Sequence, residues 1–372
     1  MRRQIESIIN DDLQRKMVFL SGPRQAGKTW LSKKIMACFS QSLYLNWDNP
    51  EHRNIIRNQA WSKKLELLVF DEIHKMDTWK SYVKGIWDTR PEHTKILVTG
   101  SARLETFRQS GDSLAGRYFH HRLLPITPEE TTWAQVPTEI NDFLTLGGFP
   151  EPYLEKSPLF ADRWRSQYLN GLIREDILQY DNINHLKEMN MLVELLRSRV
   201  ASPLSYQSLS EDIGISPNTV KKYIHILEAL YIIFLIFPYS KSISRSLVKP
   251  PKLYFFDIPL VRDPGARLEN LVALSLLRRK YLLEDSDGIP RSLHYLKTKE
   301  GKEVDFLWVK DYKPEKMFEV KASDPKPSKS LIYFHKTYGF PATQLVGHLH
   351  IERYGNVDIR DLFIWLKNPE VT

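Results

Sequence analysis

The sequence predicts an α/β protein that begins with a doubly wound parallel sheet, and three observations lead to this prediction. A glycine-bounded loop connects an apolar run to a helical segment over residues 17–36. A second apolar run, residues 65–70, ends in two adjacent carboxylates. Further apolar runs at residues 42–48, 95–101 and 118–126 supply the remaining strands. Short apolar runs bounded by turn signals are typical of buried strands.

Length and composition exclude several classes of protein. A chain of 372 residues exceeds one ordinary core, so we expect two or three domains, and a hydrophobic fraction of 42% is that of a globular protein. The longest apolar run, residues 229–237, is far shorter than the roughly 20 residues of a membrane helix. We expect no signal peptide, no internal disulfide from the single Cys38, and a cytoplasmic location. The net charge of +8 is compatible with a polyanionic partner and equally with a solvated basic surface.

The first loop has the pattern G-x-x-x-x-G-K-[ST], with a strand before it and a helix after it. Its residues are Gly22, Pro23, Arg24, Gln25, Ala26, Gly27, Lys28 and Thr29. Glycine at both ends lets the backbone curl so that successive N–H groups point at phosphate oxygens, beside the positive end of the following helix. Lys28 is placed to reach the β- and γ-phosphates, and the Thr29 hydroxyl to bind Mg²⁺. The loop therefore predicts a P-loop NTPase fold that binds ATP with Mg²⁺.

The acids Asp71 and Glu72 follow the third strand in the manner of a Walker B motif. Ligands bind at the carboxyl ends of the strands of such a sheet, so Asp71 is expected to hold the Mg²⁺ of ATP, usually through water. Glu72 is then the candidate that polarises water for attack on the γ-phosphate. The alternative is that the acids only cap a helix.

Two further catalytic candidates follow along the chain. Ser101, or Thr99 in its place, ends the fourth strand and is expected to touch the γ-phosphate or the attacking water, unless it only forms a turn. Arg117 precedes the fifth strand and is a candidate for stabilising charge on the γ-phosphate, in its own chain or in a neighbouring subunit. An ordinary surface arginine is the alternative, and an arginine supplied by a neighbour would require a homo-oligomer.

Taken together, these motifs resemble the AAA-type ATPase domain found N-terminal to a DUF4143 domain. The resemblance covers nearly the whole chain and rests on residues 22–29, 70–75, 98–103, 114–117, 147–150, 302–305 and 318–321. It implies a five-stranded parallel sheet of order 5-1-4-3-2 and a small helical lid. The usual Asp-Glu-Ile-Gln of the family is Asp71-Glu72-Ile73-His74 here, which leaves both acids in place.

The middle of the chain is helical, with a break at residues 147–150. Residues 205–239 predict a helix-turn-helix followed by a strand, that is, a winged helix. Ser216 as N-cap and Pro217 at the first helical position mark the start of the second helix. One interpretation places Asn218, Lys221 and Lys222 against DNA, and the other makes the segment a packing or oligomer module.

The last third carries acidic residues and a lysine in a defined order of elements. Glu269 lies on a predicted helix, Asp305 in the second arm of a hairpin, and Glu319 and Lys321 on one face of a strand. This order resembles the PD-(D/E)xK nuclease fold, although Val304 stands where that name has proline. Asp305 and Glu319, with Glu269, would bind Mg²⁺ or Mn²⁺, and Lys321 would orient water. A retained fold with a silent site, or a surface Glu–Lys pair, is the alternative.

The predicted organisation is an ATPase core (1–135), a helical lid (136–200), a winged helix (201–245) and a DUF4143 nuclease-like α/β domain (246–372). The leading hypothesis is an ATP-hydrolysing protein that couples its nucleotide state to DNA binding or processing. The alternative hypothesis is a nucleotide-dependent switch or scaffold that binds a protein partner and cleaves nothing.

Overall fold

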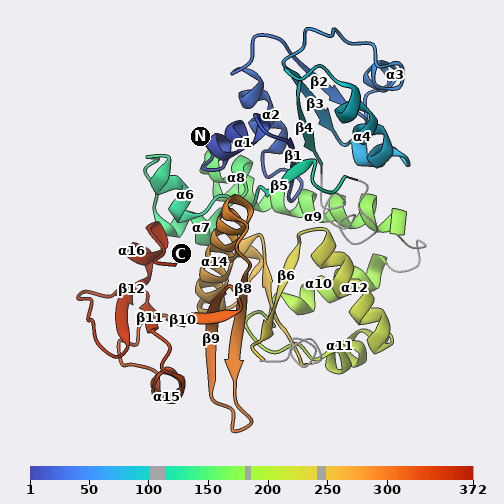
Figure 1. Cartoon of the computed structure of the whole chain (residues 1–372). Helices are drawn as coiled ribbons and strands as arrows, with labels where there is room; N and C mark the ends of the chain where they lie inside the picture. The colour runs from blue at the N-terminus through green and yellow to red at the C-terminus, as the bar shows by residue number, and fades with distance from the viewer. Residues whose placement is uncertain (101–113, 181–185, 241–248, 372) are drawn as a thin grey trace. The chain divides into compact units, whose positions relative to one another are not determined.

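A computed structural model describes residues 1–100, 114–180, 186–240 and 249–371. The chain divides into two compact units, Met1–Pro125 and Ile126–Thr372 (Figure 1). None of the described helices combines the length and apolar character needed to cross a bilayer.

The first unit is a parallel sheet flanked by helices, as predicted. Its elements are α1 (Glu6–Leu13), β1 (Met17–Ser21), α2 (Lys28–Met36), β2 (Ser42–Asn46), α3 (Pro50–Asn58), β3 (Leu67–Asp71), the 3₁₀ helix η1 (Ile73–Lys75), α4 (Trp79–Thr89), β4 (Lys95–Thr99) and β5 (Tyr118–Arg122). Within the described residues the strand order is β2-β3-β4-β1-β5, and every pair of neighbours is parallel. This confirms the expected order of a five-stranded P-loop sheet and brings the carboxyl ends of all its strands to one edge.

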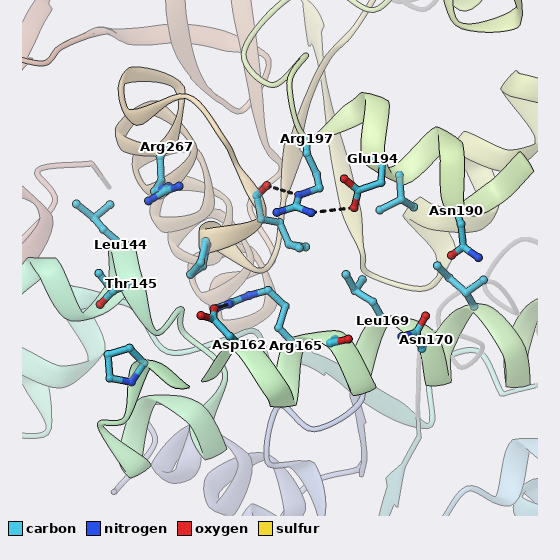
Figure 2. A pocket seen from close by; sticks show the side chains of 16 residues that line it. Leu144, Thr145, Asp162, Arg165, Leu169, Asn170, Asn190, Glu194, Arg197 and Arg267 are labelled. Atoms are coloured by element: carbon cyan, nitrogen blue, oxygen red, sulfur yellow. Dashed lines mark hydrogen bonds and ion pairs between the residues drawn. The ribbon is translucent and has the colours of Figure 1, made fainter. Parts of the chain in front are cut away.

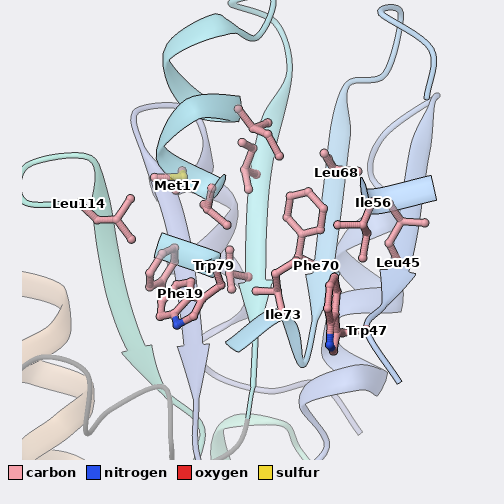
Figure 3. Close-up of a cluster of buried hydrophobic side chains, with 14 of the residues drawn as sticks. Met17, Phe19, Leu45, Trp47, Ile56, Leu68, Phe70, Ile73, Trp79 and Leu114 are labelled. Atoms are coloured by element: carbon pink, nitrogen blue, oxygen red, sulfur yellow. The ribbon is translucent and has the colours of Figure 1, made fainter. Parts of the chain in front are cut away.

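The core of this unit is built from side chains that alternate along the strands and so lie on one face of the sheet. Met17 and Phe19 of β1 join one buried cluster, which also contains Phe70 of β3 and Ile56 of α3 (Figure 3). Trp79 of α4 packs against Phe19, with 5.9 Å between the ring centroids. Full burial of side chains of this size stabilises by about 1.5–3 kcal/mol each. This core packs against both β1 and β3, the two strands that precede the functional loops.

The second unit combines helices with a mixed sheet. Its elements are α6 (Pro128–Trp133), α7 (Ile140–Thr145), α8 (Pro150–Glu155), α9 (Pro158–Tyr180), α10 (Leu186–Leu196), α11 (Tyr206–Ile213), α12 (Pro217–Ala229), β6 (Ile233–Pro238), β7 (Lys252–Phe255), the 3₁₀ helix η4 (Ile258–Leu260), α14 (Pro264–Asp287), β8 (Arg291–Lys297), β9 (Glu303–Lys310), β10 (Lys313–Lys321), α15 (Lys329–Tyr338), β11 (Ala342–Val346), β12 (Asp358–Asp361) and α16 (Leu362–Lys367). In the described part of this unit the seven strands follow the order β12-β11-β10-β9-β8-β6-β7. The nuclease-like elements predicted beyond residue 252 all contribute to this sheet or to helices that contact it.

The sheet of the second unit also includes the strand that follows the helix pair. β6 pairs antiparallel with β7 on one side and parallel with β8 on the other. The predicted domain boundary at residue 245 therefore falls between two hydrogen-bonded strands of one sheet.

Helices α11 and α12 have the caps that the sequence indicates. Gly214 ends α11 in the left-handed conformation, with φ of 80°. The hydroxyl of Ser216 accepts a hydrogen bond of 3.1 Å from the backbone N–H of Thr219, and Pro217 opens α12. Asn218 and Lys221 are exposed near the start of α12.

Candidate functional site

The loop between β1 and α2 has the tight backbone that its two glycines predict. Gly22 has φ of +145°, and a Cβ built there would lie 2.2 Å from the carbonyl oxygen of Leu123. Gly27 precedes α2 with φ of 97°, and Gln25 also has a positive φ of 60°. Only glycine fits at residue 22, because any other residue would collide with the chain that follows β5.

Lys28 lies at the start of α2, with its side chain folded back across the loop. Its Nζ donates hydrogen bonds of 2.9 Å to the carbonyl oxygen of Gly22 and 2.7 Å to that of Pro23. Burial lowers the pKa of Lys28 from 10.5 to about 8, while the nearby Glu72 and Asp71 carboxylates oppose this shift. The ammonium therefore lies in a buried, weakly solvated position, where an added phosphate charge would interact with it strongly.

Asp71 is the most heavily hydrogen-bonded carboxylate of this edge. Its Oδ2 accepts a hydrogen bond of 3.1 Å from the Thr29 hydroxyl and another from the phenol of Tyr44. Its Oδ1 accepts a hydrogen bond of 2.5 Å from the Thr99 hydroxyl. Thr99 is the direct neighbour of Asp71 in the sheet register, so the parallel pairing of β3 with β4 places its hydroxyl beside the carboxylate. The side chain of Asp71 is therefore fixed in orientation from three sides.

A magnesium ion fits the residues at this edge. Mg²⁺ prefers oxygen ligands and is usually held by one or two protein groups together with phosphate and water. The Thr29 hydroxyl and the Asp71 carboxylate form such a pair, since they already lie within hydrogen-bond distance. The structure therefore brings together the two residues predicted to hold the Mg²⁺ of ATP.

Glu72 follows β3 in the left-handed conformation, with φ of 56°. Its carboxylate lies 3.6 Å from Nζ of Lys75 and 3.6 Å from Nε2 of His74. Burial raises the pKa of Glu72 above its ordinary value, although Lys75 opposes the shift. A carboxylate with a raised pKa is a stronger base, which suits the predicted role.

Two predicted catalytic residues are not placed at this edge. Arg117 precedes β5, and β5 runs parallel to β1, so Arg117 lies at the amino ends of the strands, opposite the glycine loop. Its guanidinium pairs instead with Asp88 at 3.0 and 3.3 Å. The structure therefore does not bring Arg117 to the nucleotide loop of its own chain. Ser101 lies outside the described residues.

In the second unit, the acids predicted for a nuclease-like site lie in one neighbourhood. Glu319 and Lys321 of β10 are 2.8 Å apart, and the side chain of Asp305 on β9 accepts a hydrogen bond of 2.9 Å from the backbone N–H of Val320. Proximity to Asp305 contributes, after burial, to raising the pKa of Glu319 to about 7 and that of Glu269 to about 8. The sheet and α14 thus assemble the four predicted residues.

A fifth residue, Lys252, lies among these acids and was not predicted. Its Nζ is 2.8 Å from Glu303 Oε1 and 3.4 Å from both Glu269 Oε1 and Asp305 Oδ1. Burial by itself would lower the pKa of Lys252, but the surrounding carboxylates raise it above its ordinary value. Across the described part of the chain, no group of three or more His, Cys, Asp or Glu side chains is arranged to hold a metal ion.

A separate cavity of about 570 Å³ lies in the second unit and is lined by α7, α9, α10 and the start of α14. Figure 2 shows three arginines in its wall, Arg165, Arg197 and Arg267. Arg165 pairs with Asp162 at 2.7 Å, and Arg197 pairs with Glu194 at 2.8 Å. Carboxylates thus offset two of the three guanidinium charges, and none of the predicted site residues lines this cavity.

Two residues of these sites, Tyr44 and Lys252, were not predicted, and the sequence pattern gave only a weak indication of each. Tyr44 lies on the same face of β2 as Ser42 and Asn46, and this polar face indicates a binding partner on that side. Lys252 is a charged residue at the start of the otherwise apolar strand β7. Buried lysines are rare unless paired, so a lysine in that position signals a carboxylate partner.

Three family models match successive parts of the sequence. Residues 14–132 match the model described as AAA domain, residues 137–263 match a domain of unknown function, DUF8612, and residues 264–364 match a second one, DUF4143. Together the first and third of these matches cover the two families that the sequence motifs resemble.

Relatives occur in an archaeon and in a bacterium. The uncharacterized protein MJ1544 of Methanocaldococcus jannaschii is 26% identical over 339 residues, which cover 81% of this chain and 75% of the relative. The uncharacterized protein Rv2008c of Mycobacterium tuberculosis is 24% identical over 326 residues, covering 85% of this chain and 72% of the relative.

Two solved structures are similar to parts of this chain. The Walker-type ATPase PABY2304 of Pyrococcus abyssi superimposes with a TM-score of 0.44 at 13% identity, covering 70% of this chain and 94% of that chain. A variant of Thermotoga maritima RuvB superimposes with a TM-score of 0.31 at 16% identity, covering 62% of this chain and 86% of that chain.

Proposed function

This chain joins an AAA domain to the domains DUF8612 and DUF4143, and on that premise we propose that its first unit binds ATP with Mg²⁺ and hydrolyses it. The AAA family and the P-loop sheet are those of nucleotide-binding proteins. The observation that carries the proposal is the pairing of Thr29 with Asp71 at 3.1 Å beside the glycine loop. This pairing supplies two oxygen ligands next to a buried lysine.

Each residue of the edge has a role in the proposed reaction. The backbone of residues 22–29 and the Lys28 ammonium bind the phosphates, and Thr29 and Asp71 would hold the Mg²⁺ of ATP. When bound there, Mg²⁺ would supply positive charge beside the phosphate oxygens. Glu72 accepts the proton of the attacking water, helped by the raised pKa that its burial causes. Ser101 and an Arg117 donated by another subunit remain the predicted contacts to the γ-phosphate.

Steady-state turnover and nucleotide binding test this proposal. We expect Lys28→Ala to abolish binding of a fluorescent ATP analogue, and Glu72→Gln to retain binding but to stop turnover. The matched control is Glu66→Gln, because Glu66 precedes β3 whereas Glu72 follows it, so the same change is made at the opposite end of the strand. Hydrolysis that persists in both site variants would remove the assignment.

We further propose that the second unit binds a nucleic acid through α12 and that its affinity depends on the bound nucleotide. The exposed Asn218, Lys221 and Lys222 at the start of α12 and the net charge of +8 support this partner. Binding free energies are reciprocal, so a nucleotide that tightens DNA binding must itself bind more tightly when DNA is present.

Fluorescence anisotropy with a labelled duplex, in the presence of ADP or a slowly hydrolysed ATP analogue, tests the nucleic-acid partner. We expect the Lys221→Glu/Lys222→Glu variant to lose binding. A Lys63→Glu/Lys64→Glu variant makes the same charge change at exposed positions of the first unit and should bind normally. Equal affinities in all three proteins would favour the alternative hypothesis of a nucleotide-dependent scaffold for a protein partner.

Cleavage of the nucleic acid is the finer possibility raised by the acids of the second unit. Glu269, Asp305 and Glu319 are near one another, as a nuclease would require. The buried ammonium of Lys252 between two of them favours the alternative, in which the nuclease-like fold binds without cleaving.

A further inference from the structure

The acidic cluster of the second unit contains its own cation. Its carboxylates belong to Glu269 of α14, to Glu303 and Asp305 of β9 and to Glu319 of β10. The side chain of Lys252, only 1% exposed, enters this cluster from β7 and lies within 3.4 Å of three of the four carboxylates.

The hydrogen bonds around Lys252 hold the carboxylates toward it. Oε1 of Glu269 accepts a hydrogen bond of 2.7 Å from the phenol of Tyr254 as well as one from Lys252. Asp305 directs Oδ1 toward Lys252, while its Oδ2 accepts the backbone N–H of Val320 at 2.9 Å. A divalent cation at these oxygens would lie beside the Lys252 ammonium, so it could approach them only after that ammonium had moved away.

The charges of the cluster are also nearly balanced without a metal ion. Glu303 pairs with Lys297 at 2.8 Å in addition to Lys252, and Glu319 pairs with Lys321 at 2.8 Å. Three ammonium groups therefore face four carboxylates. A divalent cation would have to displace a buried ammonium from its carboxylate partners, and an unpaired buried charge is costly.

The metal ion that the nuclease-like order of elements implies therefore does not fit these residues. We propose that the ammonium of Lys252 is the resident cation of the cluster, so that the wild-type domain binds no divalent metal ion there and carries out no metal-dependent cleavage. The cluster instead cross-links β7, β9 and α14 by charge-assisted hydrogen bonds. Removing the ammonium and keeping the carboxylates should then create a metal site that the natural protein lacks.

Manganese binding to the full chain without nucleotide tests this inference, measured by calorimetry and by thermal unfolding. We expect wild type to show no Mn²⁺ binding that depends on Asp305. Lys252→Met should unfold at a lower temperature than wild type, and Mn²⁺ should restore several degrees of its stability because the ion binds only the folded state. Its Mn²⁺ affinity should exceed that of wild type by at least about tenfold.

Two controls separate this role from ordinary stability effects. Lys321→Met removes a partly exposed lysine of the cluster and keeps Lys252, so it should gain no Mn²⁺ site. Wild-type Mn²⁺ binding that disappears in Asp305→Asn would overturn the inference, as would a folded Lys252→Met that does not respond to Mn²⁺. If Lys252→Met fails to fold, the comparison of wild type with Asp305→Asn still decides the question.

Discussion

Tyr44 donates its phenolic hydrogen to Oδ2 of Asp71, the same oxygen that accepts the Thr29 hydroxyl. Burial and this hydrogen bond raise the pKa of Tyr44 to about 12, so the phenol stays a donor at any physiological pH. Tyr44→Phe should leave Asp71 freer to rotate and raise the Mg²⁺ concentration needed for half-maximal ATP hydrolysis by about tenfold, the equivalent of about 1.4 kcal/mol.

A magnesium titration of the turnover rate checks this first prediction. Tyr82→Phe is the matched control, because Tyr82 is a half-buried tyrosine of the same unit whose hydroxyl donates to the carbonyl of Ile56 instead. An unchanged magnesium requirement in Tyr44→Phe would show that Thr29 and Thr99 suffice to orient Asp71.

The second prediction concerns the pH dependence of nucleotide binding. Burial brings the pKa of Lys28 down to about 8, so the ammonium that binds phosphate is lost as the pH rises through that value. The dissociation constant for ATP should therefore increase by about tenfold for each further pH unit. Lys28→Arg keeps its charge over this range and should bind ATP with a weaker but flat pH profile. A flat profile for wild type would contradict the prediction.

The third prediction uses two glycines of the first unit. Gly22→Ala should prevent nucleotide binding and lower the unfolding temperature, because the new Cβ would lie 2.2 Å from the carbonyl oxygen of Leu123. Gly85→Ala in α4 has no atom within 4 Å of its new Cβ and should stabilise by about 0.5–1 kcal/mol. Thermal unfolding of both variants measures the difference, and similar unfolding temperatures would argue against the close approach at Gly22.

The fourth prediction concerns the buried ion pair of Arg165 and Asp257 in the second unit. Their side chains are 9% and 4% exposed, and Nε of Arg165 lies 2.6 Å from Oδ2 of Asp257. Arg165→Met would leave a buried carboxylate uncompensated and should destabilise by about 3–5 kcal/mol near neutral pH. The exposed pair of Arg262 and Glu194 is the control, and Arg262→Ala should cost at most about 1 kcal/mol.

The same pair predicts the direction of a pH effect. Burial raises the pKa of Asp257 above its ordinary value even with Arg165 present. A raised pKa in the folded state contributes stability below the unfolded value, and this contribution is lost as the pH rises. The deficit of Arg165→Met relative to wild type should therefore grow between acidic and neutral pH. Chemical denaturation at both pH values checks this, and a deficit that shrinks with rising pH would contradict it.

The residues at the proposed nucleotide-binding edge of the first sheet could be predicted from sequence, because each belongs either to a short sequence pattern or to the end of a strand whose direction is known. Lys28 and Thr29 are fixed by the loop pattern, and Asp71 ends a strand of a parallel sheet whose carboxyl ends share one edge. The same argument, applied to Arg117, predicts the opposite edge, since a residue before a parallel strand lies at its amino end. The direction of the strand was therefore the decisive information for that residue.

The cluster around Lys252 could not be predicted in the same way. Lys252 reaches Asp305 across a sheet in which β7 is separated from β9 by β6 and β8, and no local spacing records that order. The glycines near residue 147 were visible in the sequence as a break, but the contact that requires glycine at residue 147 also comes from a distant part of the chain. A Cβ on Gly147 would lie 2.4 Å from Oδ1 of Asp257, more than a hundred residues further along the chain.

The position of β6 also limits how this protein can be divided for experiments. Both hydrogen-bonding partners of β6 come from residues beyond 250. A truncated fragment that stops near residue 245 would present a hydrophobic strand with two bare edges, a template for aggregation. Expression work on the helix pair α11–α12 should therefore keep the chain at least through β8, and insolubility of shorter pieces would reflect the cut and not a defect of the helices.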